Sequence, residues 1–460
     1  MTLILKRTAP LLFALGVAAP TAAGAAAVQS HRLDNGLQIL VKEDRRAPVV
    51  VSMVWYRAGS MDEVSGTTGV AHVLEHMMFK GTAHTAPGEF SRLIARAGGR
   101  ENAFTNRDYT AFYQQLHKSK LPLALELEAD RMRNLALSAE EFGKEIRVVM
   151  EERRLRTDDQ PKSKLFEALM AAAYQSHPYR TPVVGWMNDL ENMRVEDARA
   201  WYERWYAPNN ATLVVVGDVV AQEVFDEAGK RFGAIPAHAL PERKPQAEPP
   251  QRGARRVVLK APAELPYVLM GWHVPVLRDV ARDVDPYALY VLSAVLDGSD
   301  AARLDRNLVR GSRVAVNAGA GYDPINRGPG LFTLDATVSQ GRTAAEVEAA
   351  LREQIESIAR DGITEPELRR VKAQVAASQV FELDSMFSQA MEIGALDNAQ
   401  LPADSFEQQA QKLQAVTAEQ VQQVVRKYLV DDSLTVAVLE PQPLAGRAPP
   451  RPPPPADRLR

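Results

Sequence analysis

The sequence predicts a protein of two similar domains, each of which combines helices with strands. The chain has 460 residues, more than one ordinary hydrophobic core organises. A helical pattern from Val195 leads into the apolar stretch 211–216, and the same order returns 222 residues later, with a helix from Thr417 and an apolar stretch at 434–438. A polar segment with five prolines lies between the copies. We therefore expect domains at 28–235 and 253–445, joined by a Pro-rich linker at 236–252.

The two ends of the chain differ in composition from these domains. Lys6 and Arg7 precede an apolar stretch at 9–19, which leads to small residues at 23–27. This order is typical of a secretory signal peptide, so we expect one at 1–27 and a periplasmic address; the alternative is a buried N-terminal helix. The stretch is too short and too interrupted by proline to form an integral membrane span. The Pro- and Arg-rich tail, 446–460, is expected to be disordered.

Composition excludes several classes of function. The chain contains no cysteine, which removes disulfides, thiolate ligands, cysteine nucleophiles and a lipid anchor at the signal cleavage region. The net charge is −3, and no basic stripe with interleaved aromatic residues is present. Nucleic acid is therefore not an expected partner.

The most informative motif is His72-x-x-Glu75-His76. On a helix, His72 and His76 project from the same face and can bind one Zn²⁺, each through a ring nitrogen. Glu75 lies one turn from His72 and can act as the general base for a water that the metal activates. A chance match is the alternative. However, the chain has only eight histidines, and an apolar helical pattern surrounds these two.

A third metal ligand is expected in a helix that follows Ser138, which resembles an N-cap with Glu141 in a capping box. Glu145 and Glu152 are two turns apart and share one face, whereas Glu151 points away from it. Glu152 is the better ligand. Glu145 is assigned to orient a ligating histidine, with a charged surface position as its alternative.

With Glu152 placed 76 residues after His76, the chain resembles the pitrilysin/insulinase metallopeptidases, in particular their bacterial branch similar to the mitochondrial processing peptidase. Further stretches resemble signatures of this family, and they are Gly98–Thr105, His177-Pro178-Tyr179, Gly185-Trp186 and Tyr206–Asn210. The resemblance implies an α+β fold of two similar domains, each an antiparallel sheet layered with helices. It also implies a Zn²⁺-dependent endopeptidase that acts on peptides or unfolded protein segments.

The repeat indicates that the second half lacks the metal site. Aligning the two halves places Tyr290, Ser293 and Ala294 opposite His72, Glu75 and His76. It also places Val371 and Ser378 opposite Glu145 and Glu152. We therefore expect only the first domain to bind metal.

Substrate binding is predicted at two places. Asn102, Ala103 and Phe104 offer an edge strand that an extended peptide could extend, although a plain structural strand is the alternative. In many relatives an Arg and a Tyr of the second domain hold the substrate carbonyl. Here Arg310 is present, but Val316 or Asn317 stands where the Tyr is expected.

The missing oxyanion donor bears on the partner. Losing one such donor typically costs about 10²- to 10³-fold in rate. The resemblance therefore implies a similar partner chain that lacks the zinc motif and forms a heterodimer, with a homodimer as the alternative. The competing function is a non-catalytic assembly or binding subunit that retains the peptidase fold.

Overall fold

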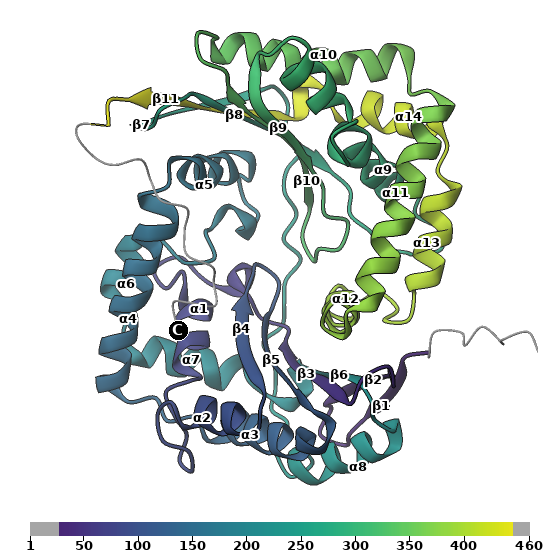
Figure 1. Cartoon of the computed structure of the whole chain (residues 1–460). Helices are drawn as coiled ribbons and strands as arrows, with labels where there is room; N and C mark the ends of the chain where they lie inside the picture. Colours follow the sequence, from purple (N-terminus) through teal and green to yellow (C-terminus); the bar gives the residue numbers. More distant parts are fainter. Residues whose placement is uncertain (1–26, 445–460) are drawn as a thin grey trace, which may run out of the picture.

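The computed structural model describes residues 27–444, which form two halves with one sheet each (Figure 1). The expected tail lies outside the described residues, as does the expected signal peptide apart from its last residue. The first sheet contains, in spatial order, β1 (Gln29–Arg32), β2 (Gln38–Glu43), β6 (Ala211–Gly217), β3 (Val49–Tyr56), β5 (Thr110–His117) and β4 (Arg100–Thr105). The second contains β7 (Arg255–Pro262), β11 (Leu434–Gln442), β8 (Tyr267–Val274), β10 (Gly330–Val338) and β9 (Ala315–Gly321).

Helices accompany both sheets. Those of the first half are α1 (Val70–Met77), α2 (Glu89–Arg96), α3 (Leu121–Asn134), α4 (Ala139–Arg153), α5 (Pro161–Ala173), α6 (Met187–Asn192), α7 (Val195–Trp205) and α8 (Ala221–Phe232). Those of the second half are α9 (Asp285–Asp297), α10 (Ala344–Asp361), α11 (Glu365–Asp384), α12 (Met386–Asn398), α13 (Phe406–Ala415) and α14 (Ala418–Tyr428). The expected linker, 236–252, contains no helix or strand.

The expected two-domain α+β fold is confirmed, with one refinement. Most strand pairs are antiparallel, but β2 pairs with β6 in parallel, and β7 pairs with β11 in parallel. Each sheet is therefore mixed, because the last strand of each half enters the sheet between its first and second long strands. The sequence repeat corresponds to the helix and the last strand of each half, since α7 leads into β6 and α14 leads into β11.

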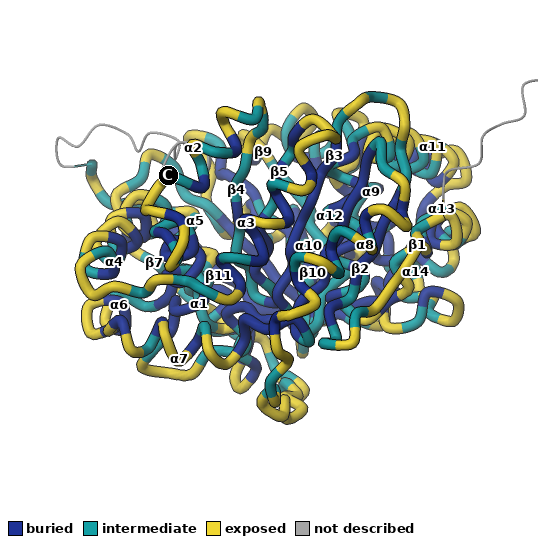
Figure 2. Tube along the Cα trace, turned by 90° about the horizontal axis from the view of Figure 1, so that it is seen from below, coloured by how far each residue is buried: buried dark blue, intermediate teal, exposed yellow. Residues whose placement is uncertain are grey.

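Each half has its own apolar core beneath its sheet. In the first half the core includes buried residues of β3 and β6, together with the inner faces of α1, α3 and α7. Strand β6 (ATLVVVG) is buried along its whole length, so both of its faces are covered. The burial map shows the dark strands in the interior and the more exposed helices outside (Figure 2).

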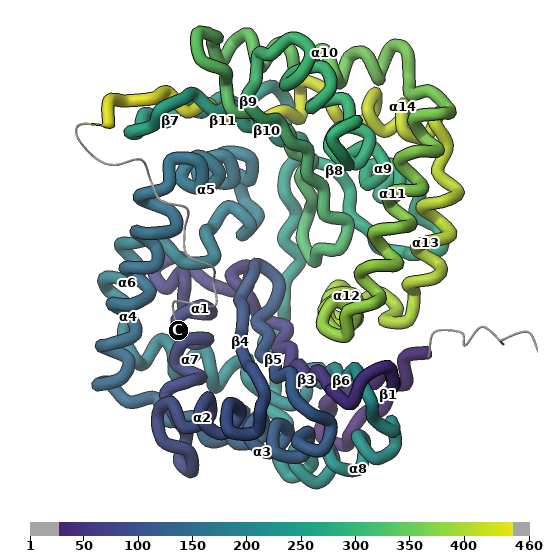
Figure 3. Tube along the Cα trace, viewed as in Figure 1, coloured from purple at the N-terminus to yellow at the C-terminus, as the bar shows by residue number. Residues whose placement is uncertain are grey.

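The two halves also exchange helices across their interface (Figure 3). From the first half, α5 packs on the second sheet through Leu165 and Leu169. From the second half, α12 packs on the first sheet through Met386, Ala390 and Ile393. The remaining face of each sheet is thus buried by a helix of the other half. Among the described residues, no helix is both long and apolar enough to cross a membrane.

Candidate metal centre

Helix α1 carries the His-x-x-Glu-His motif and is held firmly at its N-terminus. Gly69 adopts a left-handed conformation, with φ of 89°, at the N-cap. The carboxylate of Glu63 accepts hydrogen bonds from the backbone N–H groups of Gly69 (2.8 Å) and Ala71 (2.9 Å). These bonds satisfy donors that the first turn of a helix leaves free. They fix the start of the helix directly before His72.

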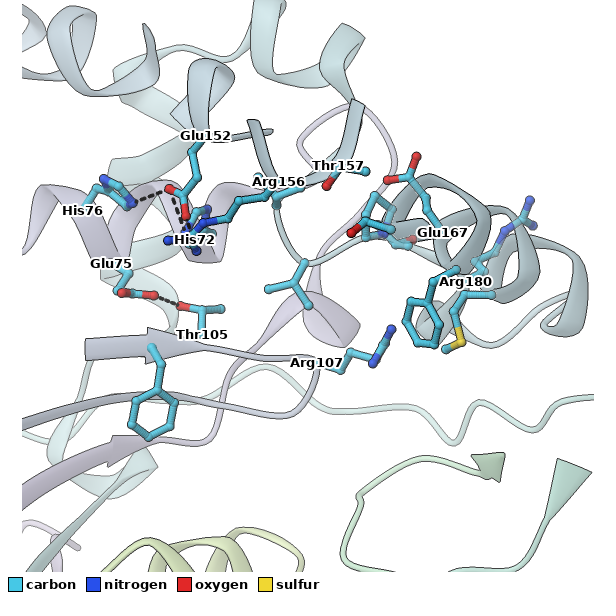
Figure 4. A pocket seen from close by; sticks show the side chains of 18 of the residues that line it. His72, Glu75, His76, Thr105, Arg107, Glu152, Arg156, Thr157, Glu167 and Arg180 are labelled. Carbon is cyan, nitrogen blue, oxygen red and sulfur yellow. Dashed lines mark hydrogen bonds and ion pairs between the residues drawn. The ribbon is translucent and has the colours of Figure 1, made fainter. Parts of the chain in front are cut away.

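The three predicted ligands converge at one point. Nε2 of His76 lies 3.4 Å from Oε2 of Glu152, and Nε2 of His72 lies 3.8 Å from the same oxygen. Zinc–ligand distances of about 2.0–2.2 Å in a tetrahedral site place neighbouring ligand atoms roughly 3.4 Å apart. The two imidazole nitrogens and the carboxylate oxygen all lie within 4.8 Å of one another, and this donor set would suit Zn²⁺ at the cavity (Figure 4).

Helix α4 supplies the carboxylates. Its N-cap is Ser138, whose hydroxyl accepts a hydrogen bond from the N–H of Glu141. Glu145 and Glu152 are buried on one face, whereas Glu151 is exposed and pairs with Arg154 at 3.1 Å. The helix faces therefore agree with the spacing argument for all three glutamates.

Glu145 lies behind His76 and outside the ligand cluster. Its Oε2 lies 3.3 Å from Nδ1 of His76, and Lys80 donates to its other oxygen at 2.7 Å. Because His76 presents Nε2 to Glu152, the contact with Glu145 can orient the ring and select the tautomer. Glu145 therefore occupies the place of an orienting partner.

The charges of the cluster alter the protonation of its members. Burial would lower the pKa of His76, but its contacts with Glu145 and Glu152 outweigh burial and raise that pKa. Burial would raise the pKa of Glu152, but the hydrogen bond from His76 and the nearby charges of His72, His76 and Arg156 lower it to about 2. The carboxylate of Glu152 is thus ionised at all ordinary pH values, as a metal ligand requires.

Glu75 faces the same cavity but is not a member of the ligand cluster. Its side chain is fully buried, and its Oε2 accepts a hydrogen bond of 2.6 Å from the hydroxyl of Thr105 (Figure 4). Thr105 ends strand β4. A carboxylate held beside a metal position by such a hydrogen bond is placed to accept a proton there.

The cavity in front of the centre has a volume of about 600 Å³. His72, Glu75, His76 and Glu152 line it together with Ala103 and Phe104 of β4. Asn102, the third predicted substrate residue, lines a neighbouring cavity of about 450 Å³ instead. Strand β4 lies at the edge of its sheet, so its outer backbone groups can accept another strand.

The structure does not bring Arg310 to this cavity. Its side chain is exposed, pairs with Asp305 at 2.6 Å and donates to the carbonyl of Asp300. Val316 is half exposed on β9, the edge strand of the second sheet. A role for Arg310 at the substrate stays a prediction. In this arrangement its side chain does not reach the cavity.

Three contacts of the centre were absent from the sequence prediction. Thr105 binds Glu75, Lys80 binds Glu145, and Arg156 pairs with Glu152 at 2.5 Å. Arg156 follows Glu152 by four positions, so helical spacing could have indicated this pair, whereas Lys80 is distant in sequence from Glu145. Arg156 lies in the π-helical segment η3 (Arg154–Asp158) that follows α4. Thr105 is distant in sequence from Glu75 and carries no local signal.

Comparison with known proteins defines the class of this chain. Residues 38–185 match the model of the insulinase family (peptidase family M16), and residues 192–375 match that of the peptidase M16 inactive domain. Zinc protease PqqE of Helicobacter pylori is 33% identical over 362 residues, covering 78% of this chain and 80% of that protein. An uncharacterized zinc protease of Mycobacterium leprae is 30% identical over 436 residues, covering 93% of this chain and 94% of that protein.

A solved structure agrees with these relatives. The crystal structure of a protease from Helicobacter pylori has a TM-score of 0.86 and 30% sequence identity, covering 90% of this chain and 100% of that chain. The chain belongs to the insulinase family of peptidases, and the predicted resemblance is confirmed.

Proposed function

We propose that this chain is a zinc-dependent endopeptidase that hydrolyses peptides or unfolded polypeptide segments. The observation that supports this most strongly is the convergence of His72, His76 and Glu152 beside Glu75 in one cavity. The names of the relatives, which are zinc proteases, agree with it. A non-catalytic assembly or binding subunit would have no use for Glu75 in this position.

His72, His76 and Glu152 would hold the Zn²⁺, which supplies Lewis acidity that lowers the pKa of water and polarises a carbonyl oxygen. Glu75 takes a proton from the attacking water as the water oxygen bonds to the scissile carbonyl carbon. When the carbon–nitrogen bond breaks, the same carboxyl group passes the proton to the leaving amine. Thr105 keeps the carboxylate of Glu75 pointed at the cavity through its 2.6 Å hydrogen bond.

Strand β4 is the proposed peptide-binding element. An extended peptide can pair with its free edge through backbone hydrogen bonds, which bind without regard to sequence. Ala103 and Phe104 line the cavity from this strand and would contact peptide side chains. The scissile bond would then lie alongside Glu75, because Thr105 joins the strand to this carboxylate.

We further propose that the chain works with a similar partner that lacks the zinc motif and that it is exported to the periplasm. The position of Arg310, away from the cavity, leaves an oxyanion donor to be supplied from elsewhere. Export rests on the N-terminal pattern of the sequence. Mass spectrometry of the native protein tests export: a chain that begins near residue 26 or 28 supports it, and an intact Met1 in a membrane fraction contradicts it.

Elemental analysis combined with cleavage of a quenched fluorescent peptide tests the proposed function. We expect about one zinc per chain, hydrolysis that a chelator abolishes, and recovery when zinc is restored. A protein that contains zinc but cleaves no peptide, with or without a similar co-purifying chain, would favour the binding-subunit function.

A further inference from the structure

The cavity in front of the metal centre carries an excess of positive charge. Its cationic lining residues are Arg107, Arg156, Lys162 and Arg180, and its acidic residue outside the metal centre is Glu167. Arg156 is paired with the ligand Glu152. Glu167 is neutralised by Arg153, whose guanidinium donates to both carboxylate oxygens, at 2.9 and 3.0 Å. Arg107, Lys162 and Arg180 therefore face the cavity without a carboxylate partner among the described residues.

Arg107 is the most confined of these cations. Its Nε is buried and has no hydrogen-bond partner within residues 27–444. Its guanidinium carbon lies 5.9 Å from the ring centre of Phe166 and 5.7 Å from that of Tyr179. Burial lowers the pKa of Arg107, and the nearby Tyr174, Tyr179 and Asp108 offset only part of this effect. Aromatic rings thus flank this cation, while the cavity remains open to it (Figure 4).

Four arginines whose side chains are at most 13% exposed are paired. The ion pairs are Arg131–Glu128, Arg153–Glu167, Arg303–Glu367 and Arg327–Asp62. A confined charge without a partner is costly, and a binding site is one place where such a cost is compensated. Arg107 therefore differs from these arginines in a way that a bound anion would explain.

The backbone around Arg107 is fixed before any ligand binds. Its carbonyl accepts a hydrogen bond of 2.9 Å from the N–H of Met61. Asn106 accepts hydrogen bonds through its side chain from the N–H groups of Asp108 (2.7 Å) and Tyr109 (2.9 Å). This turn directly continues β4, the proposed peptide-binding strand. A peptide that pairs with β4 would therefore pass the guanidinium.

We propose that this cavity selects peptides with a carboxylate close to the scissile bond and that Arg107 binds this carboxylate. The carboxylate is either an Asp or Glu side chain or the free C-terminus of a short substrate. This inference rests on the proposed peptidase function and adds its substrate class. A guanidinium can bind both oxygens of a carboxylate at once, which gives geometric specificity as well as affinity.

The other two cations contribute mainly through their field. The ammonium group of Lys162 donates to the hydroxyl of Thr337 at 2.7 Å, and Arg180 donates to the carbonyl of Gln175 at 3.0 Å. Lys162 and Arg180 each use one donor in these bonds, whereas the buried Nε of Arg107 has no hydrogen-bond partner among residues 27–444. Removing Arg180 should therefore weaken selection less than removing Arg107.

The test compares matched peptides that differ by one group. A series of amidated fluorogenic peptides carries one Glu, moved through four positions on each side of the cleaved bond, and each peptide is compared with its Gln counterpart. A second series has no acidic side chain and ends in either a free carboxylate or an amide. The wild-type protein, with any partner it needs for activity, is expected to favour the carboxylate at one position by about 10- to 100-fold in kcat/KM.

The variants assign this preference to Arg107. Arg107→Gln should reduce the ratio between the Glu and Gln peptides to near one. Arg107→Glu should instead cleave a peptide with Lys at the same position faster than its Gln counterpart. Arg147→Gln is the matched control, because Arg147 is exposed on α4 outside the cavity, and its ratio should equal that of the wild type. Each ratio compares two peptides cleaved by the same preparation. A partly unfolded preparation therefore lowers both rates equally and leaves the ratio unchanged. If Arg107→Gln does not fold, the wild-type ratio must still fall as salt is raised.

The outcomes separate the two proposals. Wild-type protein that cleaves no peptide contradicts the peptidase function itself. Cleavage of Glu and Gln peptides at equal rates, in both series, overturns the selection and leaves the peptidase function standing. A preference that Arg107→Gln leaves unchanged overturns the assignment to Arg107. Preference in the first series identifies an acidic side chain, and preference in the second identifies the C-terminal carboxylate.

Discussion

Glu145 lies outside the proposed ligand set but contacts one of its members, His76. Its carboxylate lies between Lys80 and Nδ1 of His76. It therefore links the partly exposed Lys80 to a proposed zinc ligand. From the sequence, Glu152 could be predicted as a ligand and Glu145 as the orienting partner of a ligating histidine, because the two glutamates share a helix face. The contact of Glu145 with Lys80 joins residues far apart in sequence and depends on the fold.

We expect Glu145→Gln to lower the affinity for zinc by about 10- to 100-fold without unfolding the protein, because His76 loses a charged orienting partner. Competition with a chromophoric chelator measures the affinity. Glu151→Gln is the control, since this exposed residue of the same helix pairs with Arg154 and not with the centre, and it should bind zinc as the wild type does. Equal affinities for both variants would contradict the orienting role.

Zinc affinity should depend on pH through His76. The ring must be neutral at Nε2 to bind metal; burial would lower its pKa, but contacts with Glu145 and Glu152 outweigh burial and raise that pKa above 6.5. As pH falls through this raised pKa, a proton competes with zinc and affinity falls, approaching about tenfold per pH unit below the pKa. The fall should begin above pH 6.5. Titrations that give one constant affinity from pH 8 to pH 5.5 would contradict this.

At the scale of elements, the exchange of α5 and α12 determines how the halves meet. Gly394 allows α12 to approach the first sheet closely, because a Cβ built at this position would overlap the ring of Trp55. This contact joins residues that are far apart in sequence. Helical periodicity indicates that α12 has an apolar face, but it does not indicate which sheet buries that face.

Gly394→Ala should therefore destabilise the protein by about 1–3 kcal/mol, since an added methyl group must displace backbone or the Trp55 ring. Chemical denaturation measures the free energy of unfolding. Gly143→Ala in α4 is the matched control, because a Cβ there meets nothing within 4 Å, and it should stabilise by about 0.5–1 kcal/mol. Similar effects at the two glycines would show that the close approach is not energetically important.

The whole molecule shows which features the sequence could predict. The spacing within α1 and α4 is local and helical, so the sequence alone could predict that His72, His76 and Glu152 come together. The repeat likewise predicted two related halves, but it could not show that β6 and β11 enter their sheets beside a parallel neighbour. Contacts made through the fold, such as Thr105 with Glu75 and the position of Arg107 between aromatic rings, depend on packing and have no local pattern.

The proposed partner chain is also a property of the whole assembly. The purified chain alone should bind zinc but cleave peptides weakly, and activity should rise about 10²- to 10³-fold when a partner completes the oxyanion site. Activity at a fixed chain concentration, titrated with the co-purifying partner, measures this. Full turnover by a verified monomer or homodimer would show that a donor within this chain suffices.

The central claim is that His72, His76 and Glu152 bind zinc while Glu75 acts as the base. Zinc content and peptide hydrolysis, measured on the same preparations of Glu75→Gln and His76→Ala, test it most directly. We expect Glu75→Gln to retain zinc and lose hydrolysis, and His76→Ala to lose both while remaining folded. Loss of zinc from folded Glu75→Gln as complete as that from His76→Ala would contradict the assignment.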